Sequence, residues 1–167
     1  MQPTPEHPTP GSSRQLLRHT LATLAYRGGK VMRGAPPGFA EYRAGDTSRP
    51  SGQILAHLGD LLDWALTQAN GKQDWHDSKP LTWDEGTKRF FAALKALDDY
   101  LASDVELSCP PDKLFQGAIA DSLAHVGQLA MLRRLAGAPI RAENYAQAEI
   151  VVGRVGAQQT APRREFD

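Results

Sequence analysis

Apolar residues recur at helical spacing in four long stretches of the chain. The stretches cover about 13–27, 51–69, 82–103 and 111–136, and each carries leucine or another apolar residue every three or four positions along one face. None of them shows the alternation of apolar and polar residues that is typical of a strand, and no internal repeat is present. The pattern therefore predicts an all-α protein built as a four-helix bundle.

Residues that favour helix ends bound these stretches. Gly28 and Gly29 are expected to end the first helix. Thr82 has Glu85 three residues further on, which forms a capping box at the start of the third helix. Gly137 follows the last apolar position of the fourth helix and is expected to end it.

The segments outside the helices are rich in proline, glycine and polar residues. We expect a disordered N-terminal tail over 1–12, a bundle over 13–148 with a short C-terminal helix around 142–148, and a C-terminal tail over 149–167. The connection over 28–50 is long for a compact domain and has no sustained period. Its length favours a functional flap over a site.

Composition excludes several classes of protein. Lysine plus arginine and aspartate plus glutamate each number 19, so a nucleic-acid partner or an acidic membrane surface is not expected. No apolar run approaches the roughly 20 residues of a membrane helix. The N-terminus lacks the features of a signal peptide, and Cys109 is the only cysteine. Both features favour a soluble protein of the reducing cytoplasm.

Three polar residues are predicted on inward-facing helix positions. Asp121 and His125 lie four residues apart in the fourth helix, and His57 borders the apolar stripe of the second. An unsatisfied buried polar group costs roughly 2–7 kcal/mol, so these side chains require partners. Two imidazoles and a carboxylate can bind one metal ion. An ordinary Asp–His hydrogen bond, with His57 satisfied separately, is the alternative.

Two segments add a resemblance to this pattern, ILAHLGDLLDWAL in the second helix and LAHVGQLAMLRRLAG in the fourth. They resemble the corresponding helices of the DinB-like (damage-inducible) four-helix bundles, a metal-binding superfamily, over roughly residues 14–137. His57 matches the family's helix-two histidine, and His125, followed by Val-Gly-Gln, matches the second histidine of its HxxxH pair. The first histidine of that pair falls on Asp121. The resemblance implies an up-down-down-up bundle that often forms homodimers.

The departure at Asp121 changes the chemistry of the implied site. His57, Asp121 and His125 would form a 2-His-1-carboxylate set, which is harder than three histidines and suits Mn, Fe or Mg better. The candidate cofactor is a divalent ion, namely Zn, Ni, Mn or Fe. A supporting shell around the ion has three candidates, namely Asp60, Trp64 and Gln128. The alternatives are a solvated helix face for Asp60, a core position for Trp64 and a packing role for Gln128.

Other chemically reactive side chains are expected outside this site. His7 lies in the N-terminal tail, His19 is on the polar face of the first helix, and His76 is in a polar connection that favours a surface loop. Cys109 precedes the fourth helix, whose dipole lowers a thiol pKa, but no histidine lies nearby in the sequence.

The resemblance implies a divalent-metal-dependent enzyme, either a hydrolase or a transferase that uses a low-molecular-weight thiol. A small-molecule substrate or thiol is the expected ligand, and no catalytic residue is recognisable beyond a metal-bound water. The alternative is a non-catalytic dimeric helical bundle with a structural or vestigial metal site.

Overall fold

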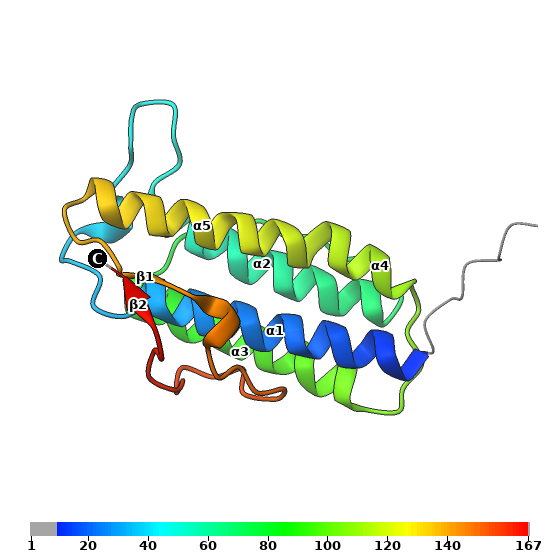
Figure 1. Ribbon diagram of the computed structural model, residues 1–167. Helices are drawn as coiled ribbons and strands as arrows, with labels where there is room; N and C mark the ends of the chain where they lie inside the picture. The colour runs from blue at the N-terminus through cyan, green and yellow to red at the C-terminus, as the bar shows by residue number, and fades with distance from the viewer. Residues whose placement is uncertain (1–9, 167) are drawn as a thin grey trace, which may run out of the picture.

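The computed structural model describes residues 10–166, and four long helices in it pack together as a bundle (Figure 1). The predicted all-α four-helix fold is therefore confirmed. The disordered N-terminal tail is predicted over 1–12; residues 1–9, with His7, lie outside the described residues, and residues 10–12 belong to the first turn of α1. The long helices are α1 (Pro10–Met32), α2 (Ser51–Ala69), α3 (Trp83–Ala102) and α5 (Ala120–Leu135).

Hydrogen bonds between helix ends fix the directions of the four helices. The Trp83 indole donates to the Met32 carbonyl at 3.1 Å, so α3 begins where α1 ends. The Tyr100 hydroxyl donates to the Ala69 carbonyl at 3.1 Å, so α2 and α3 end together and run in the same direction. Arg133, near the end of α5, donates to carbonyl groups at the end of α1. The bundle is up-down-down-up, and residues 70–82 cross its length.

Two helices have the boundaries that their capping residues predict. α2 covers Ser51–Ala69, and α3 begins directly after Thr82. The Glu85 amide donates to Thr82 Oγ1 and the Thr82 amide donates to Glu85 Oε2, both at 3.3 Å. The capping box is therefore formed, and it satisfies two amides that the first turn of a helix otherwise leaves without partners.

The predicted end of the first helix at Gly28 and Gly29 is wrong, because α1 continues through both residues to Met32. A Cβ at Gly28 would lie only 2.9 Å from Cζ of Phe90, a fully buried ring of α3. The glycine therefore allows α1 and α3 to approach closely. It marks a packing contact, whereas the sequence pattern suggested a helix end.

The predicted fourth helix contains a break that the apolar pattern does not reveal. α4 (Pro111–Leu114) leads into a π-helical turn, η2 (Phe115–Ile119), and then into α5. Gly117 within this turn has φ −87° and ψ −108°, outside helical geometry. Such π-turns shift the phase of the following helix. The residues of α4 and α5 therefore cannot be placed on one continuous helical wheel.

The apolar faces of the helices meet in one core, and its fully buried side chains stabilise the bundle by roughly 1.5–3 kcal/mol each. The largest of them, from α1 through to α5, include Leu21, Leu24, Leu58, Leu62, Phe90, Leu94, Leu97, Leu114, Ile119 and Leu129. In residues 10–166, no helix combines the length and the apolar character that crossing a bilayer requires.

The connection between α1 and α2 leaves the bundle as a protruding loop. After the short 3-10 turn η1 (Phe39–Glu41), residues 43–50 project from the end of the bundle beside α2 and α5 (Figure 1). The Ser51 amide donates to the Tyr42 carbonyl at 2.9 Å, which closes the base of this loop. Both ends of the loop are therefore held.

The predicted short helix around 142–148 is wrong. The chain instead forms a two-residue strand, β1 (Ala142–Glu143), a 3-10 turn, η3 (Tyr145–Gln147), and a second strand, β2 (Glu165–Phe166), antiparallel to the first. This C-terminal hairpin lies against α1 (Figure 1).

Buried polar groups attach the C-terminal hairpin to α1. The Glu143 carboxylate accepts hydrogen bonds from the Tyr26 hydroxyl at 2.6 Å and from Lys30 Nζ at 2.7 Å. Lys30 also pairs with Glu165 at 2.7 Å. Burial of a charge is costly unless it is paired, and Lys30, at 8% exposure, has two carboxylate partners.

The contact at Gly28 predicts a clear effect on stability. Gly28→Ala should lower the free energy of unfolding by about 1–3 kcal/mol, because the added methyl group overlaps the Phe90 ring. Gly127→Ala in α5 is the matched control, since its Cβ meets nothing within 4 Å, and it should stabilise by up to about 1 kcal/mol. Urea unfolding of both variants tests the prediction, and equal effects would contradict it.

Candidate metal centre

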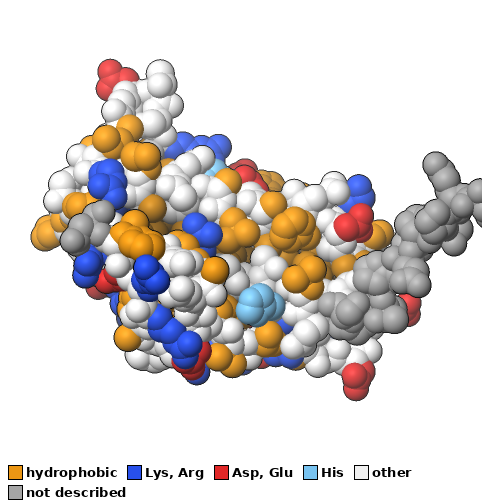
Figure 2. Space-filling model, in the orientation of Figure 1, with side chains coloured by type: hydrophobic (Ala, Val, Ile, Leu, Met, Phe, Trp, Pro, Cys, Tyr) orange, Lys and Arg blue, Asp and Glu red, His pale blue; other side chains and the backbone are white. Residues whose placement is uncertain are grey.

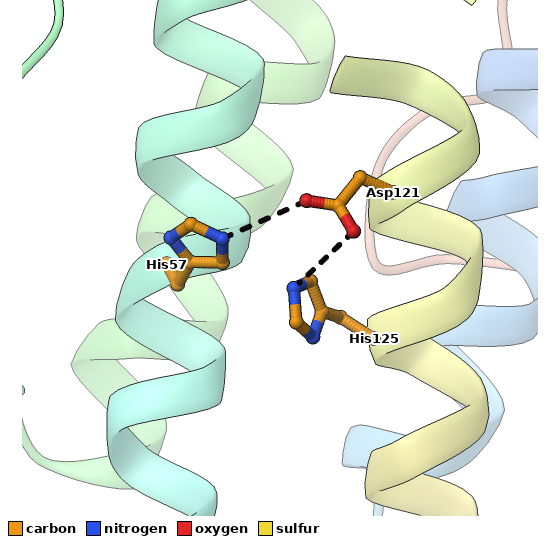
Figure 3. A group of neighbouring side chains, drawn as sticks. All are labelled: His57, Asp121 and His125. Atoms are coloured by element: carbon orange, nitrogen blue, oxygen red, sulfur yellow. Dashed lines mark ion pairs between the residues drawn. The ribbon is translucent and has the colours of Figure 1, made fainter. Parts of the chain in front are cut away.

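His57 from α2 and Asp121 and His125 from α5 converge at the interface of the two helices, as Figure 3 shows. His125 Nε2 lies 3.5 Å from Asp121 Oδ1, and His57 Nε2 lies 3.8 Å from Asp121 Oδ2. The two imidazole rings are edge to face with their centroids 4.8 Å apart. The structure thus brings together the three residues that the sequence selected.

The three side chains differ in their exposure to solvent. The His57 and His125 side chains are 20% and 12% exposed, whereas that of Asp121 is 49% exposed. The expectation that Asp121 faces the core is therefore wrong, and its carboxylate lies at the rim of the site. This position lets water solvate the carboxylate while the rings remain packed between the helices.

Gln128 orients the His125 ring. His125 Nδ1 lies 2.8 Å from Gln128 Oε1, which is only an acceptor, so Nδ1 carries the proton and donates. In a neutral ring, Nε2 then has a lone pair, and this atom faces Asp121. Gln128 therefore orients the ring whose Nε2 is a candidate ligand atom, and such contacts to the outer nitrogen are typical of metal-binding histidines.

His57 lies among aromatic rings and near Arg49. The Trp75 ring packs edge to face on His57 with centroids 5.6 Å apart, and Trp64 packs on Trp75 at 5.8 Å. Burial, then the nearby His125 and Arg49, lower the pKa of His57 below its ordinary value. A neutral imidazole at pH 7 is the form that binds metal ions.

The geometry of the three groups fits a shared ion better than direct hydrogen bonds. Charge-assisted N–H···O hydrogen bonds are about 2.7–2.9 Å long, so separations of 3.5 and 3.8 Å are too long for them. Two ligands about 2.1 Å from one tetrahedral ion lie about 3.4 Å apart. His125 Nε2 and the Asp121 carboxylate also face each other as two acceptors, an arrangement that a cation between them would stabilise.

A second group of potential ligands lies one turn further along α2. Asp60, Asp63 and His76 are close enough together to bind an ion, but the Arg89 guanidinium from α3 lies among them. Its Nη2 is 2.6 Å from Asp60, 2.8 Å from Asp63 and 3.2 Å from His76. The position of a bound cation is therefore occupied by an arginine.

Asp60 belongs to this second group, and its carboxylate accepts hydrogen bonds from Arg89 and from the Ser78 amide. It is 3% exposed, so the expected solvated helix face is wrong for this residue. Burial by itself raises the pKa of Asp60, but hydrogen bonds from the Ser78 amide and from Arg89 outweigh burial and hold this pKa below its ordinary value. His76 lies in an exposed connection, as predicted, and contacts Asp60 at 3.1 Å.

An open pocket of about 650 Å³ adjoins the metal-ligand group. One wall is polar and consists of the three candidate ligands and Gln128. Ala44, Ser48 and Arg49 from the protruding loop line it as well, so this part of the long connection lies at the site, as its length suggested. The remaining wall is apolar and is formed by Ile54, Met131, Leu132 and Leu135.

Three residues around the site, Trp75, Arg49 and Arg89, were not predicted from the sequence. Trp75 had a signal, since a tryptophan in a polar connection is unusual. The sequence carries no signal for Arg49 or Arg89, because an arginine in a loop or on a helix is ordinarily solvated.

His19 is exposed on α1, as expected. Burial and Asp112 raise the pKa of Cys109, opposite to the expected effect of a helix dipole, and this residue does not line the pocket.

In comparisons with known proteins, no family model, no curated protein and no solved structure matches the chain. The fold and the convergence of two histidines and an aspartate therefore carry the argument about function. They define a four-helix bundle with a candidate metal centre.

The Asp60–Arg89 pair predicts a pH-dependent contribution to stability. At pH 7, Asp60→Asn should destabilise the protein by about 1–3 kcal/mol, because it removes the charge of a buried carboxylate that accepts a part-buried, charge-assisted hydrogen bond from Arg89. The pKa of Asp60 is lowered by folding, so this contribution is complete above the ordinary value of about 3.9 and is lost as the pH falls through the folded-state pKa. Urea unfolding at several pH values measures it.

Asp99→Asn is the matched control for this experiment. Asp99 is an exposed partner of Lys95 on α3, and its removal should change stability by less than about 0.5 kcal/mol. If the two variants had the same effect at pH 7, or if the effect of Asp60→Asn did not shrink in acid, the assigned role of the pair would be wrong.

Proposed function

We propose that this chain binds one divalent metal ion through His57, Asp121 and His125 and that it is a metal-dependent enzyme of the DinB-like type. The observation that carries the proposal is the convergence of two imidazole nitrogens on one carboxylate at 3.5 and 3.8 Å. These distances suit three ligands of one ion. The up-down-down-up order of the helices, which the resemblance implies, adds support.

Each residue of the site has a distinct role in this proposal. His57 and His125 supply neutral nitrogen ligands, and Asp121 supplies an anionic oxygen at the solvent-facing rim. Gln128 holds the His125 ring, and Trp75 covers one side of His57. A set of three protein ligands leaves coordination positions for water or substrate, and a bound divalent ion supplies Lewis-acid activation of water or of a thiol.

The pocket supports a small-molecule reaction. Its volume of about 650 Å³ falls in the range of ligand sites, and it adjoins all three proposed ligands. Ser48 is the one hydroxyl residue among the described lining residues, and its hydroxyl donates to the Gly45 carbonyl. The proposal therefore assigns activation of the nucleophile to the ion, for hydrolysis or for transfer to a low-molecular-weight thiol. The homodimer and the cytoplasmic location stay predictions.

The proposal predicts stoichiometric metal uptake. Protein purified without a histidine tag or chelator should contain, or take up, one equivalent of Zn, Ni, Mn or Fe, as measured by elemental analysis and calorimetric titration. His57→Ala and His125→Ala should each abolish this uptake. His76→Ala should leave it unchanged, because Arg89 occupies the centre of the second group. His19→Ala, on the exposed face of α1, is the surface control.

Two assays on metal-loaded and chelator-treated protein then separate the candidate functions. One follows hydrolysis of a p-nitrophenyl ester, and the other follows conjugation of glutathione or cysteine to an electrophilic arene. If either assay shows metal-dependent turnover and His125→Ala abolishes it, the result supports the proposed enzymatic function. Stoichiometric metal without turnover favours the non-catalytic bundle, and failure of the wild-type protein to take up any of the four metals contradicts the metal centre itself.

The contact between Gln128 and His125 predicts a smaller effect on metal affinity. Gln128→Ala should weaken zinc binding by about 10–100-fold without changing the stability of the metal-free protein, because the His125 ring loses the acceptor that orients it. Gln53→Ala, at an exposed position of α2, is the matched control. Equal zinc affinities for the two variants would exclude this role of Gln128.

A further inference from the structure

Arg49 is the one cationic side chain among the described residues that line the pocket. It lies at the end of the protruding loop over 43–50, one residue before the proline that precedes α2. The pocket thus has a guanidinium contributed by one segment and the candidate metal ligands contributed by α2 and α5.

The loop that carries Arg49 is held in place by hydrogen bonds. Ser51 donates to the Tyr42 carbonyl through its amide at 2.9 Å and through its hydroxyl at 3.2 Å. A turn between Gly45 and Ser48 closes the loop further out, where the Ser48 amide donates to the Gly45 carbonyl at 3.0 Å. The backbone on both sides of Arg49 is therefore fixed. Its charge also acts on the site, since it helps to lower the pKa of His57.

Several other arginines of the bundle have protein partners, and Arg49 differs from them. Arg18 pairs with Asp98, Arg89 pairs with Asp60, and Arg133 donates to main-chain carbonyls. Within residues 10–166, no side chain or carbonyl group forms an ion pair or hydrogen bond with the Arg49 guanidinium. A guanidinium presents a planar set of donors that matches a carboxylate, and here that set is available to a ligand.

The charges around the pocket are unbalanced once a metal ion is bound. Asp121 is the one acidic side chain among the described lining residues. A divalent ion, Asp121 and Arg49 together contribute a net charge of +2 to the pocket. The opposite wall, with Ile54, Met131, Leu132 and Leu135, is apolar. The complementary occupant is therefore an anion that also has an apolar body.

We infer that the pocket binds a small-molecule carboxylate with an apolar body and that Arg49 binds its carboxylate beside the metal centre. This inference rests on the proposed function, because the bound ion contributes to the excess of positive charge. The apolar part of the ligand lies along Ile54, Met131 and Leu135, which positions the group next to the carboxylate near His57 and Asp121.

The test uses 4-phenylbutyrate and its neutral analogue 4-phenylbutyramide as probes on the zinc-loaded full chain, with binding measured by calorimetry. The wild-type protein should prefer the acid to the amide, and Arg49→Gln should weaken binding of the acid by roughly tenfold, the size of one charge-assisted hydrogen bond. Arg43→Gln is the matched control, because Arg43 lies on the same loop, is exposed and lines a different depression. It should change binding by less than twofold.

Zinc titrations of the same proteins separate this inference from the proposed function. Zinc affinity of Arg49→Gln within a few-fold of the wild-type value, together with the loss of preference for the acid, supports the anion-binding role. If the wild-type protein binds zinc but Arg49→Gln retains the full preference, or if Arg43→Gln weakens binding equally, the inference is wrong and the metal centre stands. If the wild-type protein does not bind zinc, both proposals fail.

Discussion

The pairing of one guanidinium with two carboxylates determines how the polar side of this bundle is organised. Arg89 on α3 binds Asp60 and Asp63 on α2 and contacts His76 in the crossing segment, so it joins two helices and their connection. It also neutralises the acidic residues nearest to His57 on α2. The adjoining pocket is left with a single carboxylate, that of Asp121, among its described lining residues. The chemistry available at the site depends on this separation of charge.

The candidate centre follows from ordinary rules of helix packing. Residues four apart lie on one face of a helix, so Asp121 and His125 meet a single histidine from the facing helix. Apolar and aromatic neighbours partly bury the two rings, and burial lowers the pKa of His57 below its ordinary value. The rim position of the carboxylate leaves the centre open toward the pocket. A buried triad would have the same ligands but no route for a substrate.

Capping residues and apolar periodicity predicted those helix boundaries that are determined by interactions within the helix itself. The capping box at Thr82 and the apolar periodicity of α2 set helix boundaries within the segment itself, and both predictions are confirmed. Gly28 was misread because its role is to accommodate Phe90, sixty-two positions away, and nothing nearby in the chain reports that contact. The π-turn at Gly117 keeps apolar residues at helical spacing, so periodicity does not detect it. The convergence of His57, Asp121 and His125 was predictable from spacing and resemblance, whereas Arg49 and Arg89 act only through tertiary neighbours.

The attachment of the C-terminal hairpin to α1 has a consequence for where this domain can be cut. Lys30 and Tyr26 lie within the first helix, yet their partner Glu143 follows the last helix. A shortened version that stops at the end of α5 would leave a buried ammonium group without its counter-ions. Fusions or crystallisation variants should therefore keep Glu143 and Glu165, the two carboxylate partners of Lys30, and place their junctions beyond Glu165.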